Sequence, residues 1–445
     1  MKRLLATLVT AICGAALLSM YLVPTADAAP YTPKQGVVFN NAAGGNAAER
    51  RAQTVLDNTI SAVPSCYASR GCKTRQKITM AMYLFNQSST ANRLISAHRR
   101  GVDVRLLIDN GAWDAAQIKR LRKALGTNKK ARSYVASCSR GACMTNYPYG
   151  TIHVKYYLFS RSGRAKNVSM ISSANPHGVN IYNSFNNTHT IAGNAAIYNR
   201  LMTYFVDMTK NKQNHRYGNG KNTHSGPFSL YIYPQRTSRN GQIIQYLDVL
   251  RGVQCRTRSN MGSKGRTVVR MSMWGFTNPR MDVAKRLWSL QNAGCKVDVT
   301  LNRGRASRTI MRQLTKSTKH GKMVVEDAWR DTNRNDYAEQ YTHHKAMIIN
   351  GRQKLNGRVV DSRVVYSGSQ NLTSSGSLYN DDMVLRVVGS GYYFAYSKNF
   401  SYIQKKSKRL KKTPPPIILK SKRSDDARLS PDAYVEARAN AEDGG

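Results

Sequence analysis

The chain has 445 residues, of which 41% are hydrophobic, so it can form two half-domains around one large core and is neither disordered nor fibrous. Lys and Arg number 69 against 24 Asp and Glu, which gives a formal net charge of +45. This charge predicts anionic partners such as nucleic acid, acidic lipid surfaces or anionic wall polymers. It does not choose among them, and it identifies no chemistry.

The N-terminus has the pattern of an export signal. Two basic residues precede an apolar run at positions 4–23, and Ala26-Asp27-Ala28 forms a small-residue cleavage site. We expect residues 1–28 to be a signal peptide cleaved near Ala28, and the mature protein to be secreted and extracellular. The alternative is an uncleaved anchor, because the apolar run approaches the length that spans a bilayer. Pro24 and the Ala-x-Ala pattern favour cleavage.

Six cysteines remain after that cleavage. An even number in an exported chain predicts disulfides, although six cysteines allow fifteen pairings. Zinc is the alternative, but no Cys-x-x-Cys element or nearby histidine pair accompanies these cysteines, so we expect no metal. Two short spacings favour local pairs, and the third pair follows by elimination. The expected pairs are Cys66 with Cys72, Cys138 with Cys143, and Cys255 with Cys295.

Two stretches of the chain repeat one order of elements. Residues 77–85 and 268–276 read as buried strands with Met, Met and Phe at matching positions. A polar turn, an amphipathic helix ending at a glycine, and a second strand follow each of them. Strand, helix and strand in this order predict a parallel βαβ unit with a right-handed crossover. The helices are expected at 90–100 and 281–292, and the second strands at 102–108 and 297–301.

The longer spacing repeats as well. Met80 precedes His153 by one residue more than Met271 precedes His343, which supports a duplication. A stretch rich in Gly, Asn and Lys is the natural connector between the copies. The chain end turns from basic to polar and acidic, which predicts disorder. We expect a signal peptide (1–28), a first half (36–210), a connector (211–226), a second half (227–405) and a basic then disordered tail (406–445).

Each half carries a His-x-Lys element followed by a Ser-x-Asn element. On a strand, alternate residues share a face, so His-x-Lys places a general acid or nucleophile beside a fixed cation. The intervening His344 is then expected on the opposite face, in a structural or exposed position. Ser and Asn supply neutral donors that suit phosphoryl oxygens. The residues are His153, Lys155, Ser173 and Asn175 in the first half, and His343, Lys345, Ser369 and Asn371 in the second.

These paired elements resemble the phospholipase D superfamily, in which His-x-Lys-x4-Asp and Gly-Ser-x-Asn occur twice per active site. The resemblance covers roughly residues 36–405 and implies an α/β fold of two pseudo-symmetric α-β-α sandwich halves with the active site at their seam. It implies that one histidine forms a phosphohistidine while the other protonates the leaving alcohol and then activates water. No metal or other cofactor is implied. The phosphate oxygens would be held by Lys155, Lys345, Asn175 and Asn371, with Ser173 and Ser369 beside them.

The chain departs from the family pattern at acidic positions. Ser160 and Asn350 stand where the family carries Asp after His-x-Lys. The family often places an acidic residue after the Asn to orient a histidine; Asp382 supplies one in the second half, and the matching first-half segment supplies none. This predicts that His343 has a carboxylate partner and His153 has none. The carboxylate argument therefore favours His343 as the nucleophile, whereas the resemblance favours His153, and the sequence leaves the choice open.

Three functions fit these residues. We expect a phosphoric diester hydrolase, and in the first place a secreted phospholipase D acting on glycerophospholipids. A nonspecific nuclease is the alternative that the charge favours, and a catalytically silent binder of anionic polymers is the alternative that the missing Asp positions allow. The expected partner is a phospholipid or other anionic phosphodiester, with nucleic acid and peripheral membrane contact as alternatives, and we expect a monomer. The loops at 113–149 and 303–340 are expected to decide the substrate.

Overall fold

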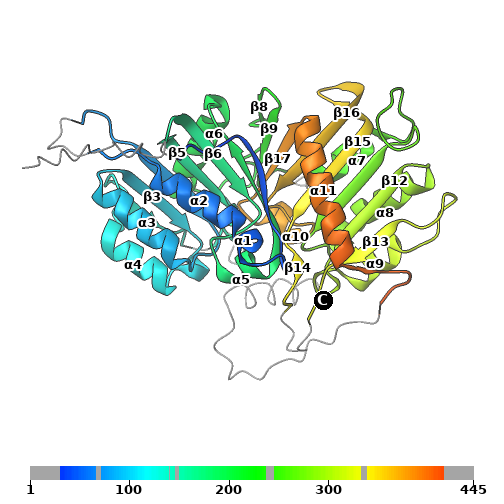
Figure 1. Cartoon of the computed structure of the whole chain (residues 1–445), viewed down its shortest axis with the longest axis horizontal. Helices are drawn as coiled ribbons and strands as arrows, with labels where there is room; N and C mark the ends of the chain where they lie inside the picture. The colour runs from blue at the N-terminus through cyan, green and yellow to red at the C-terminus, as the bar shows by residue number, and fades with distance from the viewer. Residues whose placement is uncertain are drawn as a thin grey trace, which may run out of the picture. The chain divides into compact units, whose positions relative to one another are not determined.

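The computed structural model describes residues 31–66, 72–139, 141–145, 150–236, 245–331 and 338–414. Two mixed β-sheets, of eight and ten strands, lie within these ranges (Figure 1). The predicted signal peptide and the tail beyond residue 414 lie outside the described residues. In the described part of the chain, no helix combines the length and the apolar character needed to cross a bilayer.

The strands of the first sheet come mainly from the first half. They are β1 (Gly36–Asn40), β2 (Lys77–Met82), β3 (Asp103–Ile108), β4 (Tyr134–Ala136), β5 (Tyr156–Ser162), β6 (Ala165–Ser172), β7 (Ser184–Ile191) and, from the second half, β14 (Tyr341–Thr342). The second sheet contains β8 (Thr223–Ser225), β9 (Phe228–Ile232), β10 (Val253–Gln254), β11 (Val268–Met273), β12 (Lys296–Leu301), β13 (Val324–Asp327), β15 (Lys345–Leu355), β16 (Arg358–Gly368), β17 (Met383–Val388) and β18 (Lys408–Arg409).

The helices divide in the same way. The first half contains α1 (Asn46–Glu49), α2 (Arg51–Ser61), α3 (Ser88–Arg99), α4 (Ala116–Leu125), α5 (Gly178–Tyr182) and α6 (Ala195–Thr209). The second half contains α7 (Gln245–Arg251), α8 (Met281–Asn292), α9 (Arg308–Leu314), α10 (Ser374–Leu378) and α11 (Ser390–Lys406).

The two sheets repeat one strand order. The first runs β1-β7-β6-β5-β2-β3-β4, and the second contains the matching run β9-β17-β16-β15-β11-β12-β13. In both runs the last three strands are parallel, and the remaining neighbours pair antiparallel. The same order with the same strand directions confirms the predicted α/β fold of two pseudo-symmetric halves.

The predicted βαβ units are present in both halves. Helix α3 joins the parallel pair β2 and β3, and α8 joins the parallel pair β11 and β12. Gly101 follows α3 with a φ of 85°, a left-handed conformation that favours glycine at a helix end. A Cβ at Gly101 would lie 2.0 Å from the carbonyl oxygen of Cys66, so the close approach of that loop also requires glycine.

Helices cover both faces of each sheet, as the α-β-α prediction requires. On the outer face of the first sheet, Met80 of β2 packs in a buried cluster with Leu94 of α3. The inner faces of both sheets meet in one shared core, which contains Tyr204 of α6, Ile348 of β15 and Tyr396 of α11. The halves therefore form one folded unit, in agreement with the expected large common core.

Each half also sends a short segment into the sheet of the other half. Strand β14 of the second half pairs in parallel with β7 of the first. In the reciprocal contact, Ile152 of the first half forms a parallel bridge with Asp381, which lies just before β17. These two segments directly precede His343 and His153, so each histidine directly follows a residue that pairs with the opposite half.

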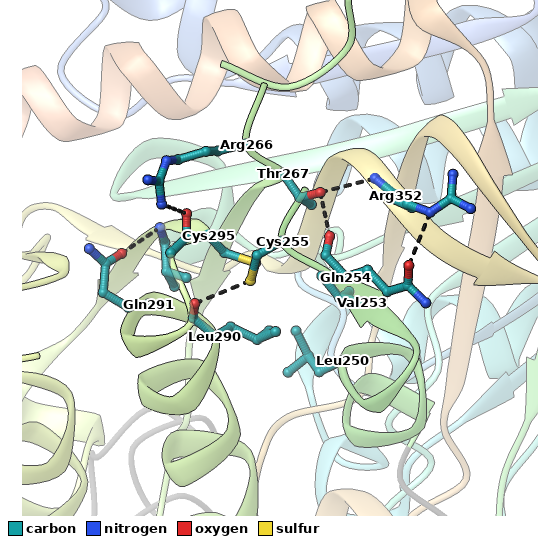
Figure 2. The surroundings of a disulfide bond; sticks show 12 residues. Leu250, Val253, Gln254, Cys255, Arg266, Thr267, Leu290, Gln291, Cys295 and Arg352 are labelled. Carbon is teal, nitrogen blue, oxygen red and sulfur yellow. Dashed lines mark hydrogen bonds between the residues drawn. A yellow bond between two sulfur atoms is a disulfide. The ribbon is translucent and has the colours of Figure 1, made fainter. Parts of the chain in front are cut away.

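All three predicted disulfides are present. Two of them close short loops in the first half, and Cys255–Cys295 joins the end of β10 to the start of β12 (Figure 2). Thr267 beside this bridge donates to the carbonyl oxygen of Gln254 at 2.6 Å and accepts from the backbone N–H of Arg352 at 3.0 Å. Disulfides of this kind persist in oxidising compartments, which is consistent with an extracellular protein.

Two segments predicted outside the halves contain strands of the second sheet. The connector predicted at 211–226 contains β8, which pairs with β9. The tail predicted from residue 406 starts at the last residue of α11 and contains β18, which pairs with β13. The second sheet therefore extends into both segments.

Candidate active site

The two His-x-Lys elements lie where β5 and β15 begin. His153 and Lys155 directly precede β5, while His343 lies between β14 and β15 and Lys345 opens β15. The expectation that both histidines lie within a strand is wrong, because the residues before them pair with the opposite half instead. All four side chains are buried, with 7% of His153 and 4% of His343 exposed.

Different side chains hold the two imidazoles. His153 Nδ1 lies 3.1 and 3.2 Å from the two carboxylate oxygens of Asp382. His343 Nδ1 lies 3.0 Å from the amide oxygen of Asn186. Because Nδ1–H donates to oxygen in each case, a neutral ring carries its lone pair on Nε2. Each neutral ring therefore presents a lone pair on Nε2 that can attack phosphorus or accept a proton, and it can protonate a leaving group only after it has taken up a proton there.

The expected pairing of Asp382 with His343 is wrong, because Asp382 contacts the histidine of the other half. Asp382 serves His153, and the histidine without a carboxylate partner is His343. The backbone N–H of His153 donates to the carbonyl oxygen of Asp381 at 3.0 Å, which places the next carboxylate against the ring. In the other half-site, the side-chain amide of Asn186, a residue of β7, contacts the ring of His343. Each histidine is thus oriented by the opposite half.

Ser173 and Ser369 hold these orienting groups. Ser369 Oγ donates to Asp382 Oδ1 and accepts from the backbone N–H of Met383. Ser173 Oγ donates to Asn186 Oδ1 at 2.8 Å. Each serine hydroxyl therefore donates to the group that contacts a histidine ring.

The side-chain oxygens of Asn175 and Asn371 also bind protein. Asn175 Oδ1 accepts from the backbone N–H of Leu84 at 3.1 Å, and its Nδ2 donates to Asn180 at 2.8 Å. Asn371 Oδ1 accepts from the backbone N–H of Gly275 at 3.3 Å. Both carbonyl oxygens therefore fix the segments that follow β2 and β11.

Two buried ammonium groups accompany the histidines. Lys155 Nζ donates to the carbonyl oxygen of His153 at 2.5 Å, and Lys345 Nζ donates to that of His343 at 3.0 Å. Positive charges gathered in a buried site attract an anion, because the low dielectric of the interior strengthens the attraction. Among the described residues, no group of three or more His, Cys, Asp or Glu side chains is placed to hold a metal ion.

Burial lowers the pKa of both imidazoles. For His153 burial, and then the charge of Lys155, lower the pKa to about 4, although Asp382 raises it in part. For His343 burial, then Lys345, Lys155 and His153, lower the pKa well below its ordinary value. Both lysines act on each ring, so the four groups share one site. Both rings are neutral at pH 7 and can act as bases or nucleophiles.

Two further buried carboxylates were missed in the sequence. Asp109, which directly follows β3, accepts from the backbone N–H of Ile152 at 2.8 Å, and burial raises its pKa to about 6. Asp381 accepts from the N–H groups of Cys143 and Met144 at 2.6 and 3.0 Å, and burial raises its pKa to about 8. The Asp109 carboxylate fixes the residue just before His153, and the Asp381 carboxylate fixes the chain at Cys143 and Met144. Asp109 directly follows the predicted strand at 102–108, and this position at a strand end could have marked it as a site residue.

The aromatic surroundings of the two histidines differ. Tyr83 lies 5.7 Å from His153 between ring centres, and the matching Trp274 lies 5.2 Å from His343. Trp274 also packs against Trp329 and Tyr341, at 6.3 and 4.7 Å between ring centres, whereas Tyr83 lies in a buried cluster with Met82 and Phe85. The two rings therefore have different neighbours.

The positions that replace the family's Asp have local structural roles. Ser160 donates to the side chain of Gln76 at 2.9 Å, and Asn350 accepts from the backbone N–H of Gly262 at 3.1 Å. His344 is fully buried and bonded on both ring nitrogens, to Asn187 and Asn399, so the structural alternative holds and the exposed one is wrong.

Known proteins share this arrangement. The family model described as "Cardiolipin synthase, PLD-like domain" matches residues 72–209 and 263–404, and each range contains one complete set of His-x-Lys and Ser-x-Asn elements. The chain belongs to the phospholipase D superfamily. This match confirms the resemblance found in the sequence. Members of this superfamily are phosphodiesterases and phosphotransferases. No curated protein sequence matches the chain.

Solved structures of the superfamily share the fold at low identity. The phosphatidylserine synthase of Haemophilus influenzae is 13% identical with a TM-score of 0.56, over 85% of this chain and 88% of the synthase. The polyphosphate kinase of Porphyromonas gingivalis is 12% identical with a TM-score of 0.53, over 92% of this chain. The chain spans only about half of that kinase, since the match covers 53% of it. At these identities the likeness concerns the fold alone.

Proposed function

We propose that this chain is a metal-independent phosphodiesterase that cleaves glycerophospholipids through a phosphohistidine on His153. The observation that carries the choice of nucleophile is the contact between His153 Nδ1 and the Asp382 carboxylate. A carboxylate at Nδ1 makes Nε2 more basic and balances the positive charge that the ring gains on forming a bond to phosphorus. His343 has only the neutral amide of Asn186 at that position, which suits a proton donor.

In the first step, Lys155 and Lys345 hold the diester phosphate between the two rings. His153 Nε2 forms a bond to phosphorus while the bond to the leaving alcohol breaks. His343 gives the proton on Nε2 to that alcohol oxygen. Burial and then the lysine charges lower the pKa of His343 in the free protein. A bound phosphate offsets the lysine charges, so substrate binding raises this pKa and favours the protonated ring.

In the second step, His343 is neutral and acts as the base. It takes a proton from water as the water oxygen attacks phosphorus, and the bond between phosphorus and His153 Nε2 breaks. The phosphomonoester leaves, and both rings return to their starting protonation states. For a glycerophospholipid cut at its distal ester, the products are the free headgroup alcohol and a phosphatidate.

Three observations support a phospholipid substrate. The matching family model is named after cardiolipin synthase, and a phosphatidylserine synthase shares the fold. The predicted export, with which the three disulfides agree, would bring the protein to membrane surfaces. The second candidate is a nuclease, which the formal charge of +45 favours through attraction to a polynucleotide backbone.

The roles of the two histidines are tested first, with a synthetic substrate. With a p-nitrophenyl phosphodiester the leaving group needs no proton, so His343→Ala should release p-nitrophenol in a single burst and accumulate a phosphoenzyme. His153→Ala should give neither. Mass spectrometry of the alkali-quenched protein locates the adduct, and His224→Ala, which alters a histidine bonded to Ser229, is the control expected to behave as wild type. An adduct on His343 in the wild-type protein would reverse the proposed roles.

The substrate is tested on the wild-type protein in EDTA. Phosphatidylcholine vesicles and plasmid DNA are supplied separately. Headgroup release supports the lipid proposal, and nicking supports the nuclease. Binding without either reaction overturns the proposed activity and leaves the silent binder.

A further inference from the structure

The Cys138–Cys143 disulfide closes a loop that touches the residue next to Asp382. Asp381 Oδ2 accepts from the backbone N–H of Cys143 at 2.6 Å, and Oδ1 accepts from that of Met144 at 3.0 Å. Both donors are consecutive backbone groups at one end of the closed loop, an arrangement that suits an anion. The disulfide ties that end to Cys138, so it fixes where the two donors lie.

The loop and the residues after it bind each of the three second-half residues at positions 379–381, which directly precede Asp382. Thr145 Oγ1 donates to the carbonyl oxygen of Tyr379 at 2.5 Å. The backbone N–H of Thr151 donates to Asn380 Oδ1 at 3.1 Å, and the carbonyl oxygen of Thr151 accepts from the N–H of Asp381 at 3.0 Å. The direction of the chain at Asp382 is therefore determined by first-half residues.

One further bond connects this segment to the nucleophile. The carbonyl oxygen of Asp381 accepts from the backbone N–H of His153 at 3.0 Å, and Ile152 pairs with Asp381. A shift of Asp381 would move both the backbone of His153 and the carboxylate that meets its ring. Misplacement of a reacting group by about 1 Å can cost roughly a hundredfold in rate.

The second half-site lacks this device. Phe185 occupies the position that matches Asp381, and its carbonyl oxygen accepts from the N–H of His343 at 2.9 Å. Its side chain is apolar and fully buried in the shared core. Packing therefore holds the His343 side, whereas a carboxylate bound to a disulfide loop holds the His153 side.

The buried Asp381 carboxylate depends on the loop donors. Leaving a buried acceptor without its partners is unfavourable, and more so when the acceptor is charged. If the loop opened, both contacts would be lost and the Asp381 side chain would turn toward water. That movement would release the segment that carries Asp382.

We infer that Asp381 and the Cys138–Cys143 disulfide position the Asp382 carboxylate against His153, so that this disulfide supports the nucleophilic step beyond its contribution to folding. This inference rests on the proposed role of His153. It makes Asp381 a positioning residue, since its side chain reaches the reacting ring only through the backbone and Asp382.

The test compares two disulfides of nearly equal loop size, with sequence separations of 5 and 6. One variant combines Cys138→Ser with Cys143→Ser, and the matched control combines Cys66→Ser with Cys72→Ser. The burst rate of p-nitrophenol release is measured with the thermal unfolding midpoint. The first variant should lose about tenfold to a hundredfold in burst rate, and the control should retain the wild-type rate even if both unfold at lower temperature.

Asp381→Asn provides a second route if the cysteine variant fails to fold, because the amide keeps the size of the side chain but replaces one acceptor oxygen by a donor. It should reduce the burst rate similarly. It should also move the acid limb of the rate profile below about pH 4, because a displaced Asp382 raises the pKa of His153 less. An unchanged burst rate in Asp381→Asn, or equal losses in the two cysteine variants, overturns the inference. A wild-type protein that forms no adduct on His153 would instead overturn the proposed function.

Discussion

The two half-sites share a backbone and differ in a few side chains. In both, a histidine enters the site just before the central antiparallel strand, and its N–H bonds to a carbonyl oxygen of the opposite half. The His153 ring meets the Asp382 carboxylate, whereas the His343 ring meets the Asn186 amide. Duplication thus provides two equivalent positions around one phosphate, and single substitutions make them unequal.

This difference suits a reaction that needs two kinds of histidine. A ring that becomes positively charged as it bonds to phosphorus benefits from an adjacent carboxylate. A ring that must release its proton benefits from the absence of one, because a carboxylate would stabilise the protonated form. The same scaffold therefore yields a nucleophile and an acid from one pair of residue types.

The largest effect is expected from Asp382→Asn. This change removes the charge at Nδ1 of His153, and the loss of such an orienting carboxylate lowers the rate by roughly 10²–10⁴-fold in comparable sites. Asn186→Ala removes the matching partner of His343 and should cost less in the burst phase, where the leaving group needs no proton. Burst rates and thermal unfolding midpoints of both variants provide the measurement.

An equal loss in the two variants would show that the carboxylate has no special role. The comparison sharpens in the double variant Asp382→Asn with Asn186→Asp, which exchanges the two partners. It should restore part of the lost activity and shift the trapped adduct toward His343, as detected by mass spectrometry.

A smaller effect is expected from the aromatic neighbours. Trp274→Leu removes a ring that lies against His343, so it should slow the release of an alkyl alcohol such as choline by about tenfold, the effect of 1.4 kcal/mol at the transition state. It should leave the p-nitrophenol burst unchanged. Tyr83→Leu disturbs His153 and should slow both reactions. If Trp274→Leu slows the burst as much as choline release, His343 is not a dedicated proton donor.

The sequence predicted much of this fold because its signals are local. Met80 and Met271 head matching strand, helix and strand patterns, and both βαβ units are present with their parallel pairing. The short cysteine spacings predicted the correct disulfides. Hydrophobic period, helix ends and loop spacing need no knowledge of distant contacts.

The partner of each histidine depends on such distant contacts. Asp382 lies only 39 positions from His343 in the sequence, so its assignment to that ring was natural, yet it contacts His153 at 3.1 Å. The decisive feature is the exchange of short segments between sheets, in which Ile152 pairs with Asp381 and β14 with β7. Nothing in a linear motif reports this exchange, because each element retains its own spacing while its neighbours change.

The smallest expected effect concerns stability in acid. His344 has Val154 as its first-half counterpart, and burial lowers the pKa of His344 to about 3. Below its ordinary pKa of 6.5 an unfolded chain binds a proton on this ring that the folded chain does not bind, so this ring lowers the free energy of unfolding as pH falls toward 3. His344→Asn should be less stable than wild type at neutral pH, and the gap should narrow as the pH falls. Urea unfolding across this range measures the gap, with the exposed His320→Asn as the control; a gap that is constant with pH would show that the buried ring does not oppose protonation.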